Sequence, residues 1–212
     1  MNTDWIIQPP EILRRLFPNS LWRLDSHERR EIAFTFDDGP VPEQTPWVLD
    51  ILAKYGIKAA FFCVGDNVRK YPEIFERICA EGHIVGNHTF NHLQLLHSGW
   101  SDYRRNIDMC NDVENNRAHF FRAPHGQITP WRARQLTQSG QFQKIVFWDV
   151  MPKDYDRNLT PQQVFDNINR YARNGSIIVM HDSIKAGERM RYALEKTINE
   201  FGEKGFSFVP IA

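Results

Sequence analysis

The stretch Ile32-Ala33-Phe34-Thr35-Phe36-Asp37-Asp38-Gly39-Pro40 decides the fold. Its first five residues are β-branched or aromatic, apart from one alanine, which predicts a buried strand over 32–36. Two carboxylates then stand where this strand ends, directly before a Gly-Pro turn. A helix is expected next, with Thr45 as its N-cap, Pro46 as its first residue and Gly56 as its stop. The stretch therefore begins a β–turn–α unit with acidic groups at the carboxyl end of its strand.

The same alternation of strand and helix continues along the rest of the chain. Such alternation predicts an α/β fold with a parallel sheet, either open or closed into a barrel. Further strands are expected at 59–64, 84–86, 119–122, 145–150, 177–180 and 206–209, and further helices at 72–81, near 101–115, near 130–138, from Thr160-Pro161 onward, and near 187–203.

Ionisable residues stand at the carboxyl ends of most of these expected strands. In a barrel these ends converge on one face, where barrel enzymes place their active sites, whereas an open sheet would spread them along an edge. We therefore expect a distorted (β/α) barrel of about seven parallel strands, similar to a TIM barrel. The residues are Asp37 and Asp38 after the first strand, His88 after the third, Arg122 after the fourth, Asp154 after the fifth, and His181 at the end of the sixth.

Length and charge restrict the class of protein. The 212 residues, 42% of them hydrophobic, are enough for one sizeable core, so we expect a catalytic domain over 31–212 with an N-terminal extension, 1–30, packed on it. The 26 basic and 26 acidic residues balance, so no overall field indicates a nucleic-acid partner. The three cysteines are odd in number and lack CxxC spacing, which predicts reduced thiols.

The N-terminal sequence predicts neither a secretory signal nor a membrane span. Asp4, Pro9, Pro10 and Glu11 interrupt the apolar stretch that a signal would need, so the chain as written is expected in the cytoplasm, or outside it if a leader had been removed. The apolar and arginine residues of 12–23 could form a short interfacial element, but a buried strap is the favoured interpretation. No oligomeric state is predicted.

His88 and His92 offer two imidazoles for one divalent metal. The spacing is a weak signal by itself, but one helical turn would bring both rings to the same side. Asp37 and Asp38 could be an ordinary solvated turn, or they could divide two roles, one binding the metal and one accepting a proton from the water it activates. Zinc suits two imidazoles and a carboxylate, and Co²⁺ or Ni²⁺ would fit the same ligands. The set predicts a metal hydrolase.

The remaining candidates are ambiguous when taken singly. His181 emerges from a buried apolar run, and it could serve a site or simply cap the following helix. Arg122 could be an exposed arginine at a strand end, and Asp154 could be an ordinary loop carboxylate. Their significance depends on the motifs in which they occur.

Five short motifs occur together, in one order along the chain. From about residue 31 to 209 they make the chain similar to the NodB-homology polysaccharide deacetylases, carbohydrate esterase family 4. The motifs are Thr35-Phe36-Asp37-Asp38-Gly39-Pro40, His88-Thr89-Phe90-Asn91-His92, Arg122-Ala123-Pro124-His125-Gly126, Asp154-Tyr155 and Val179-Met180-His181.

The resemblance implies an enzyme that hydrolyses a carbon–nitrogen bond in a linear amide. It would remove acetyl groups from N-acetylglucosamine units, as in peptidoglycan or chitin-like oligomers, so a carbohydrate is the implied partner. Asp38, His88 and His92 would bind the metal, preferably zinc, and Asp37 would be the general base.

The resemblance also assigns the supporting groups. Arg122 would orient Asp37, Asp154 would tune the pKa of His181, and His181 would protonate the departing amine. The backbone N–H of His125 would help to polarise the carbonyl, and the side chains of His125 and Tyr155 would line the substrate groove.

Three positions depart from the family pattern and leave alternatives open. His125 replaces the usual Tyr, Tyr155 replaces the usual Trp, and Met151 replaces a residue that is often acidic. One alternative is therefore a carbohydrate-binding protein without catalysis. The other is a deacylase of an O-acetylated xylan or of a formylated lipid-linked amino sugar.

Overall fold

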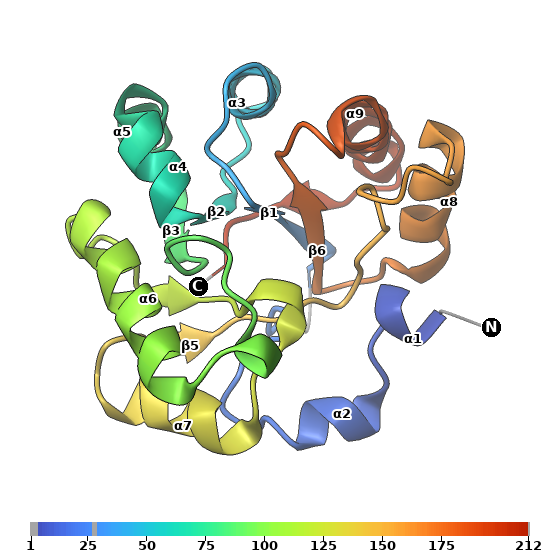
Figure 1. The fold of residues 1–212 in the computed structure, drawn as a ribbon. Coiled ribbons are helices and arrows are strands. Elements are labelled where there is room, and N and C mark those ends of the chain that lie inside the picture. Colours follow the sequence, from blue (N-terminus) through green and yellow to red (C-terminus); the bar gives the residue numbers. More distant parts are fainter. Residues whose placement is uncertain (1–3, 27–28, 212) are drawn as a thin grey trace.

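The computed structural model describes residues 4–26 and 29–211. Its seven strands form one sheet in the order β5-β4-β3-β2-β1-β6, with β7 paired to the start of β1, and every pairing between these strands is parallel. The sheet curls into a partial barrel (Figure 1), which confirms the predicted fold class. The strands are β1 (Glu31–Asp37), β2 (Ala60–Cys63), β3 (Ile84–Asn87), β4 (Phe120–Phe121), β5 (Lys144–Ile145), β6 (Ser176–His181) and β7 (Ser207–Phe208).

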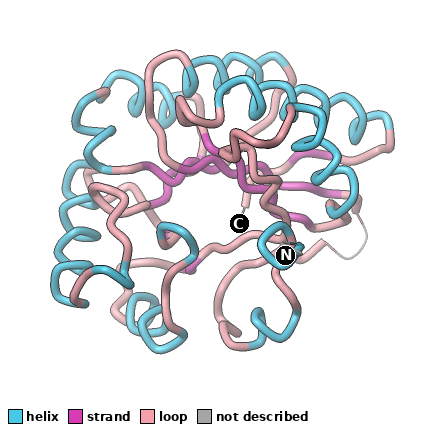
Figure 2. Tube along the Cα trace, turned by 45° about the vertical axis from the view of Figure 1, so that its right-hand side comes forward, coloured by secondary structure: helices cyan, strands magenta, loops and turns pink. Residues whose placement is uncertain are grey.

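Helices surround the curled sheet on its outer side, and the strands run through the middle of the molecule (Figure 2). Most of them connect one strand to the next, as expected for a chain of β–α units. They are α1 (Asp4–Ile7), α2 (Glu11–Arg15), α3 (Gln44–Lys54), α4 (Gly65–Lys70), α5 (Pro72–Ala80), α6 (Trp100–Val113), α7 (Pro130–Gln138), α8 (Pro161–Tyr171) and α9 (Gly187–Glu203).

Strand β1 places its side chains alternately on two sides of the sheet, as the period of two requires. Phe34 and Phe36 belong to the large apolar cluster that also contains buried residues of the helices. Ala33 belongs to a smaller cluster inside the barrel, where its short side chain leaves room for Phe62 and Phe120. Asp37 follows in the same alternation, so its carboxylate points to the barrel interior at the carboxyl end of the strand.

The gap between β5 and β6 is closed by single bridges and by the N-terminal segment. Val150 bridges to Ile178 of β6, and Leu21 of the N-terminal segment bridges to Val146. The backbone N–H groups of Leu21 and Phe147 donate in turn to the carbonyls of Ile145 and Leu21, both at 2.8 Å. In Figure 1, α1 and α2 accordingly lie between α7 and α8 in the ring of helices.

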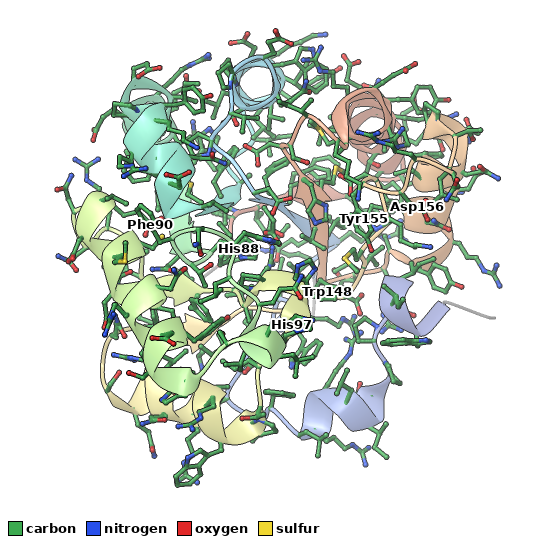
Figure 3. The ribbon with its side chains drawn as sticks, viewed as in Figure 1. His88, Phe90, His97, Trp148, Tyr155 and Asp156 are labelled. Atoms are coloured by element: carbon green, nitrogen blue, oxygen red, sulfur yellow. The ribbon has the colours of Figure 1, made fainter. Side chains whose placement is uncertain are left out.

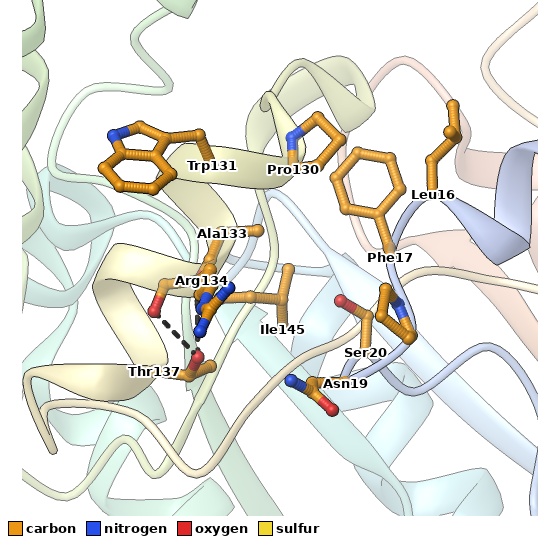
Figure 4. A pocket seen from close by; sticks show the side chains of 11 residues that line it. Leu16, Phe17, Asn19, Ser20, Pro130, Trp131, Ala133, Arg134, Thr137 and Ile145 are labelled. Carbon is orange, nitrogen blue, oxygen red and sulfur yellow. Dashed lines mark hydrogen bonds between the residues drawn. The ribbon is translucent and has the colours of Figure 1, made fainter.

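The N-terminal segment contributes both buried and exposed apolar residues. Ile7, Phe17 and Trp22 are buried, whereas Ile12 and Leu16 are exposed. A groove remains between the end of this segment and α7 (Figure 4). None of the helices in the described part of the chain combines the length and the apolar character needed to cross a membrane. Residues 1–3, 27 and 28 of the expected extension lie outside the described residues.

Two local predictions were wrong, and one helix was not predicted. Thr45 is not an N-cap: α3 begins at Gln44, and the Thr45 hydroxyl donates instead to the carboxylate of Asp182. Strand β5 ends at Ile145 because the following residues turn toward β6 and the N-terminal segment. Helix α4 was not predicted, since its sequence, Gly65–Lys70, has little apolar periodicity. The Thr160 N-cap is confirmed, and it forms a capping box with Gln163.

Candidate active site

The predicted site residues come together at the carboxyl ends of the strands. A cavity of about 630 Å³ opens there, and three of the residues that line it, His88, Trp148 and Tyr155, are labelled in Figure 3. Arg122 and Asp154 do not line the cavity, because both are fully buried behind it. The predicted residues that do line it are Asp37, Asp38, His88, His92, His125, Tyr155 and His181.

Asp38, His88 and His92 form a group that fits a divalent metal. One potential ligand atom from each of them lies within 4.8 Å of the other two. The Nε2 atom of His92 is 3.3 Å from Oδ1 of Asp38, and that of His88 is 3.8 Å from the same oxygen. This Asp38 oxygen is buried and has no hydrogen-bond partner. A buried carboxylate oxygen without a partner costs free energy unless it binds a cation, and here two imidazoles lie beside it. The residues present therefore fit the implied metal.

The ring of His88 is already oriented for such a role. Its Nδ1 lies 2.7 Å from the carbonyl oxygen of Arg122, so the ring donates there and leaves Nε2 unprotonated toward the metal group. Burial, together with the charge of His92, lowers the pKa of His88 to about 3. The imidazole is therefore neutral at ordinary pH, which is the form that binds metals.

His88 and His92 converge by a loop rather than by the predicted helical turn. Thr89 and His92 both have positive φ angles, 64° and 57°, and no helix covers 88–92. The loop is held by Asn106 on α6, whose side-chain oxygen accepts from the backbone N–H groups of Phe90 and Asn91. Asn106 was not predicted, because nothing in its local sequence marks a residue that supports a loop from the next helix.

Arg122 and Asp37 form the first buried ion pair of the site. Nη1 of Arg122 is 2.6 Å from Oδ1 of Asp37, and the same guanidinium donates to the carbonyls of Val146 and Phe147. The other Asp37 oxygen, Oδ2, is 3.9 Å from Nε2 of His88. One carboxylate oxygen is thus held by Arg122, while the second faces the metal group.

Asp154 and His181 form the second pair. Nδ1 of His181 is 2.8 Å from Oδ1 of Asp154, and the backbone N–H of His181 donates to Oδ2 at 2.7 Å. Burial by itself lowers the pKa of His181, but the charge and hydrogen bond of Asp154 outweigh it and raise the pKa to about 10. His181 is therefore protonated at neutral pH, with Nδ1 committed to Asp154 and Nε2–H available to the cavity.

His125 and Tyr155 frame the mouth of the cavity. His125 has a φ of 56°, a conformation that favours glycine, and its ring lies edge-on to His92 with centroids 4.8 Å apart. The ring of Tyr155 meets that of His181 edge-on at 5.1 Å, and the Lys185 ammonium lies 5.4 Å from the Tyr155 ring centroid. Both substituted motif positions therefore contact groups of the site.

Part of the cavity wall was not predicted at all. Trp5, Ile6, Pro9 and Leu13 of the N-terminal segment line the cavity together with Trp148. Nε1–H of Trp148 donates to the Ile6 carbonyl at 3.2 Å, which joins the two parts of this wall. The contact spans 142 residues of chain, so no local pattern could have indicated it.

The arrangement combines three groups suited to amide hydrolysis. The metal group could hold a cation that activates water and a carbonyl, Asp37 offers a free carboxylate oxygen, and His181 offers an acidic N–H. These groups border one cavity, although they come from β1, the loop after β3 and the end of β6.

Comparison with known proteins agrees with this geometry. Residues 24–143 match the polysaccharide deacetylase family model. A peptidoglycan-N-acetylglucosamine deacetylase of Bacillus cereus is 35% identical over 87% of this chain and 68% of its own length. A chitooligosaccharide deacetylase of Rhizobium leguminosarum bv. trifolii is 32% identical over 75% of this chain and 74% of its own.

A solved structure extends the agreement to three dimensions. It is a peptidoglycan N-acetylglucosamine deacetylase in complex with 4-naphthalen-1-yl-N-oxidanyl-benzamide, with a TM-score of 0.82 and 31% identity. The match covers 95% of this chain and 94% of that one, so the two chains share almost their whole fold. The predicted family and enzyme class are confirmed, and the chain belongs to the polysaccharide deacetylase family.

Proposed function

We propose that the protein hydrolyses the acetamido group of N-acetylglucosamine units in an oligosaccharide or polysaccharide, with a divalent metal held by Asp38, His88 and His92. The observation that carries the proposal is the pair of proton-handling groups beside the metal group, Asp37 held by Arg122 and His181 held by Asp154. A protein that only bound sugar would need neither. The names of the relatives support this choice of substrate.

The mechanism assigns one task to each group. The metal, when bound, polarises the amide carbonyl and makes water more acidic. Oδ2 of Asp37 takes a proton from the attacking water, and Arg122 holds the carboxylate in place through Oδ1.

The departing amine needs a proton, which His181 supplies from Nε2. Asp154 holds the ring in the tautomer that keeps Nε2 directed to the substrate, and it stabilises the imidazolium before transfer. The backbone N–H of His125 supports the developing negative charge on the carbonyl oxygen. The side chains of His125 and Tyr155 contact the sugar.

Zinc is the proposed metal, because two imidazoles and one carboxylate with an open position are its usual catalytic set. Cobalt and nickel are the alternatives, since the same ligands accept them. We also infer that 31–212 is the catalytic domain and that 1–30 is an extension packed on it.

Acetate release from N-acetylglucosamine oligomers tests the proposal. The purified protein would be stripped with a chelator and then reconstituted separately with Zn²⁺, Co²⁺ and Ni²⁺, with Asp37→Asn measured alongside. We expect release that requires metal and is lost in the variant, while the variant still binds metal. An Asp37→Asn protein as active as the parent would overturn the mechanism. Sugar binding without release by any metal form would favour the carbohydrate-binding alternative, and release only from acetyl esters or formyl amides would favour the other deacylases.

A further inference from the structure

The wall of the active-site cavity differs sharply between its two sides. Among the described lining residues, the carboxylates and imidazoles are those of the catalytic centre, and Lys185 lies beside Tyr155 at the same end. The other side is apolar, and we call it the apolar chamber. Its main residues are Ile6, Pro9, Leu13, Phe147, Trp148 and Met151.

The apolar chamber is built from two segments whose polar backbone groups bond to each other. The N–H of Met151 donates to the Ile7 carbonyl at 2.8 Å, beside the bond from Trp148 to Ile6. Helix α2 is fixed by the ion pair between Arg14 and Asp149, with 2.6 Å between Nη2 and Oδ1. Because these polar groups are already paired, the two segments present mainly side-chain carbon to the cavity.

The size and chemistry of this wall exceed what an acetyl methyl group would use. The whole cavity, about 630 Å³, is within the range of pockets that enclose drug-sized ligands, about 300–1,000 Å³. A second sugar could pack only its apolar C–H face on this wall, and any hydroxyl turned toward the apolar chamber would lose hydrogen bonds to water without replacing them. An alkyl or aryl group would instead gain by leaving water.

We propose that the apolar chamber binds an alkyl or aryl group that the substrate carries close to the scissile amide. The inference rests on the proposed function, and it narrows the substrate to an N-acylated amino sugar with an apolar substituent. Such a group could be the acyl chain of the amide or the aglycone at the anomeric carbon, and both would use the same wall.

Four matched compounds separate these sources. Methyl and octyl N-acetyl-β-glucosaminides test the aglycone, and N-acetyl- and N-octanoylglucosamine test the acyl chain, all below the micellar concentration of the octyl compounds. We expect kcat/KM to rise on the order of 10- to 100-fold in the long-chain member of one pair, which corresponds to burial of about two or three methylenes at roughly fourfold each. If neither octyl compound is hydrolysed faster than its short partner while N-acetylglucosamine oligomers are hydrolysed, the inference is wrong and the proposed function stands.

Adjacent residues of α2 provide matched variants. Leu13 lines the chamber, whereas Ile12 is exposed and does not. Leu13→Gln should bring the octyl-to-methyl ratio of kcat/KM close to one, and Ile12→Gln should keep the parent ratio. Equal loss in both variants would contradict this location. Ile6→Gln serves as a second chamber variant if Leu13→Gln does not fold, because only the backbone carbonyl of Ile6 bonds to Trp148.

A binding measurement removes the dependence on catalysis. Isothermal titration of the metal-stripped protein with both pairs of compounds should show at least about tenfold tighter binding of the long-chain member in one pair, lost in Leu13→Gln. If no compound is hydrolysed but this difference is found, the apolar chamber is supported and the proposed activity fails. Equal binding within both pairs would overturn the inference.

Discussion

Two buried arginine–aspartate pairs in this protein have nearly the same geometry in different regions. Arg122–Asp37 lies at the catalytic centre, and Arg14–Asp149 joins α2 to the segment that closes the barrel. Both pairs have an N–O distance of 2.6 Å, and all four side chains are at most 7% exposed. In both pairs the arginine also donates to a backbone carbonyl, that of Val146 for Arg122 and that of Pro9 for Arg14.

The pairs differ in what their carboxylates have left to offer. Oδ2 of Asp149 accepts from the Ser176 hydroxyl at 2.6 Å, and Arg173 makes a further contact with Oδ1 at 3.2 Å. Oδ2 of Asp37 instead faces His88 and the metal group. A buried ion pair is therefore structural where both oxygens are occupied, and it can serve catalysis where one oxygen remains free.

The largest expected effect comes from removing the free oxygen. Asp37→Asn keeps the size of the side chain but takes away the base, so kcat should fall about 10²- to 10⁴-fold. Metal content, measured by mass spectrometry, should match that of the parent, because Asp37 is not one of the proposed ligands. A variant with normal kcat would show that the free oxygen has no catalytic role, and the distinction between the two pairs would fail.

The corresponding change in the other pair should affect folding without removing a catalytic group. Asp149→Asn leaves the buried Arg14 without its anion, so the free energy of unfolding should fall by about 3–5 kcal/mol in urea titrations. The rate per folded molecule should change far less than in Asp37→Asn. Asp66→Asn is the control, since its pair with Lys70 is at the surface and should contribute no more than about 1 kcal/mol. An Asp149→Asn protein as stable as this control would contradict the structural assignment.

The metal group should depend on a support of its own, Asn106. Asn106→Ala removes the side-chain oxygen that accepts from two backbone N–H groups of the loop that carries His92, and it leaves the Phe90 N–H only the backbone carbonyl at position 106. Metal affinity should therefore weaken about 10- to 100-fold. Competition with a chromophoric chelator measures this affinity. Arg105→Ala, an exposed neighbour on the same helix, should retain the parent affinity. Equal affinities in the two variants would show that the loop holds its shape without Asn106.

A third carboxylate, Asp154, should act through the pKa of its partner. Asp154 raises the pKa of His181 by stabilising the imidazolium, so Asp154→Asn must lower that pKa. The alkaline limb of the pH profile of kcat/KM, where His181 loses its proton, should move to lower pH. Measured near neutrality, the resulting change in activity should be the smallest of those predicted here. Asp156→Asn, two residues away and paired with Lys153, should leave the profile in place. An unmoved alkaline limb in Asp154→Asn would separate Asp154 from the titration of His181.

Local sequence determined much of the fold and of the candidate site. The β-branched and aromatic residues of Ile32–Phe36 predicted β1 and placed Asp37 and Asp38 at its carboxyl end, and Thr160-Pro161 predicted the start of α8. Such features depend on neighbours one to four residues apart, so a short window contains their physical cause. The five motifs then brought the site residues together, because parallel strands all end on the same face of the barrel.

Tertiary structure alone decided the features that depend on distant partners. Thr45 resembles an N-cap, but Asp182, 137 residues away, takes its hydroxyl. His88 and His92 meet through a left-handed loop that Asn106 supports from α6, and the wall of Trp148 with Ile6 joins opposite parts of the chain. The sequence by itself determined which groups reach the mouth of the barrel, because each of these groups follows or ends a strand, and the position of a residue along its strand is a local property. Only the packed chain decided how the mouth is closed and how apolar one wall is, because those properties belong to contacts between segments that meet on folding.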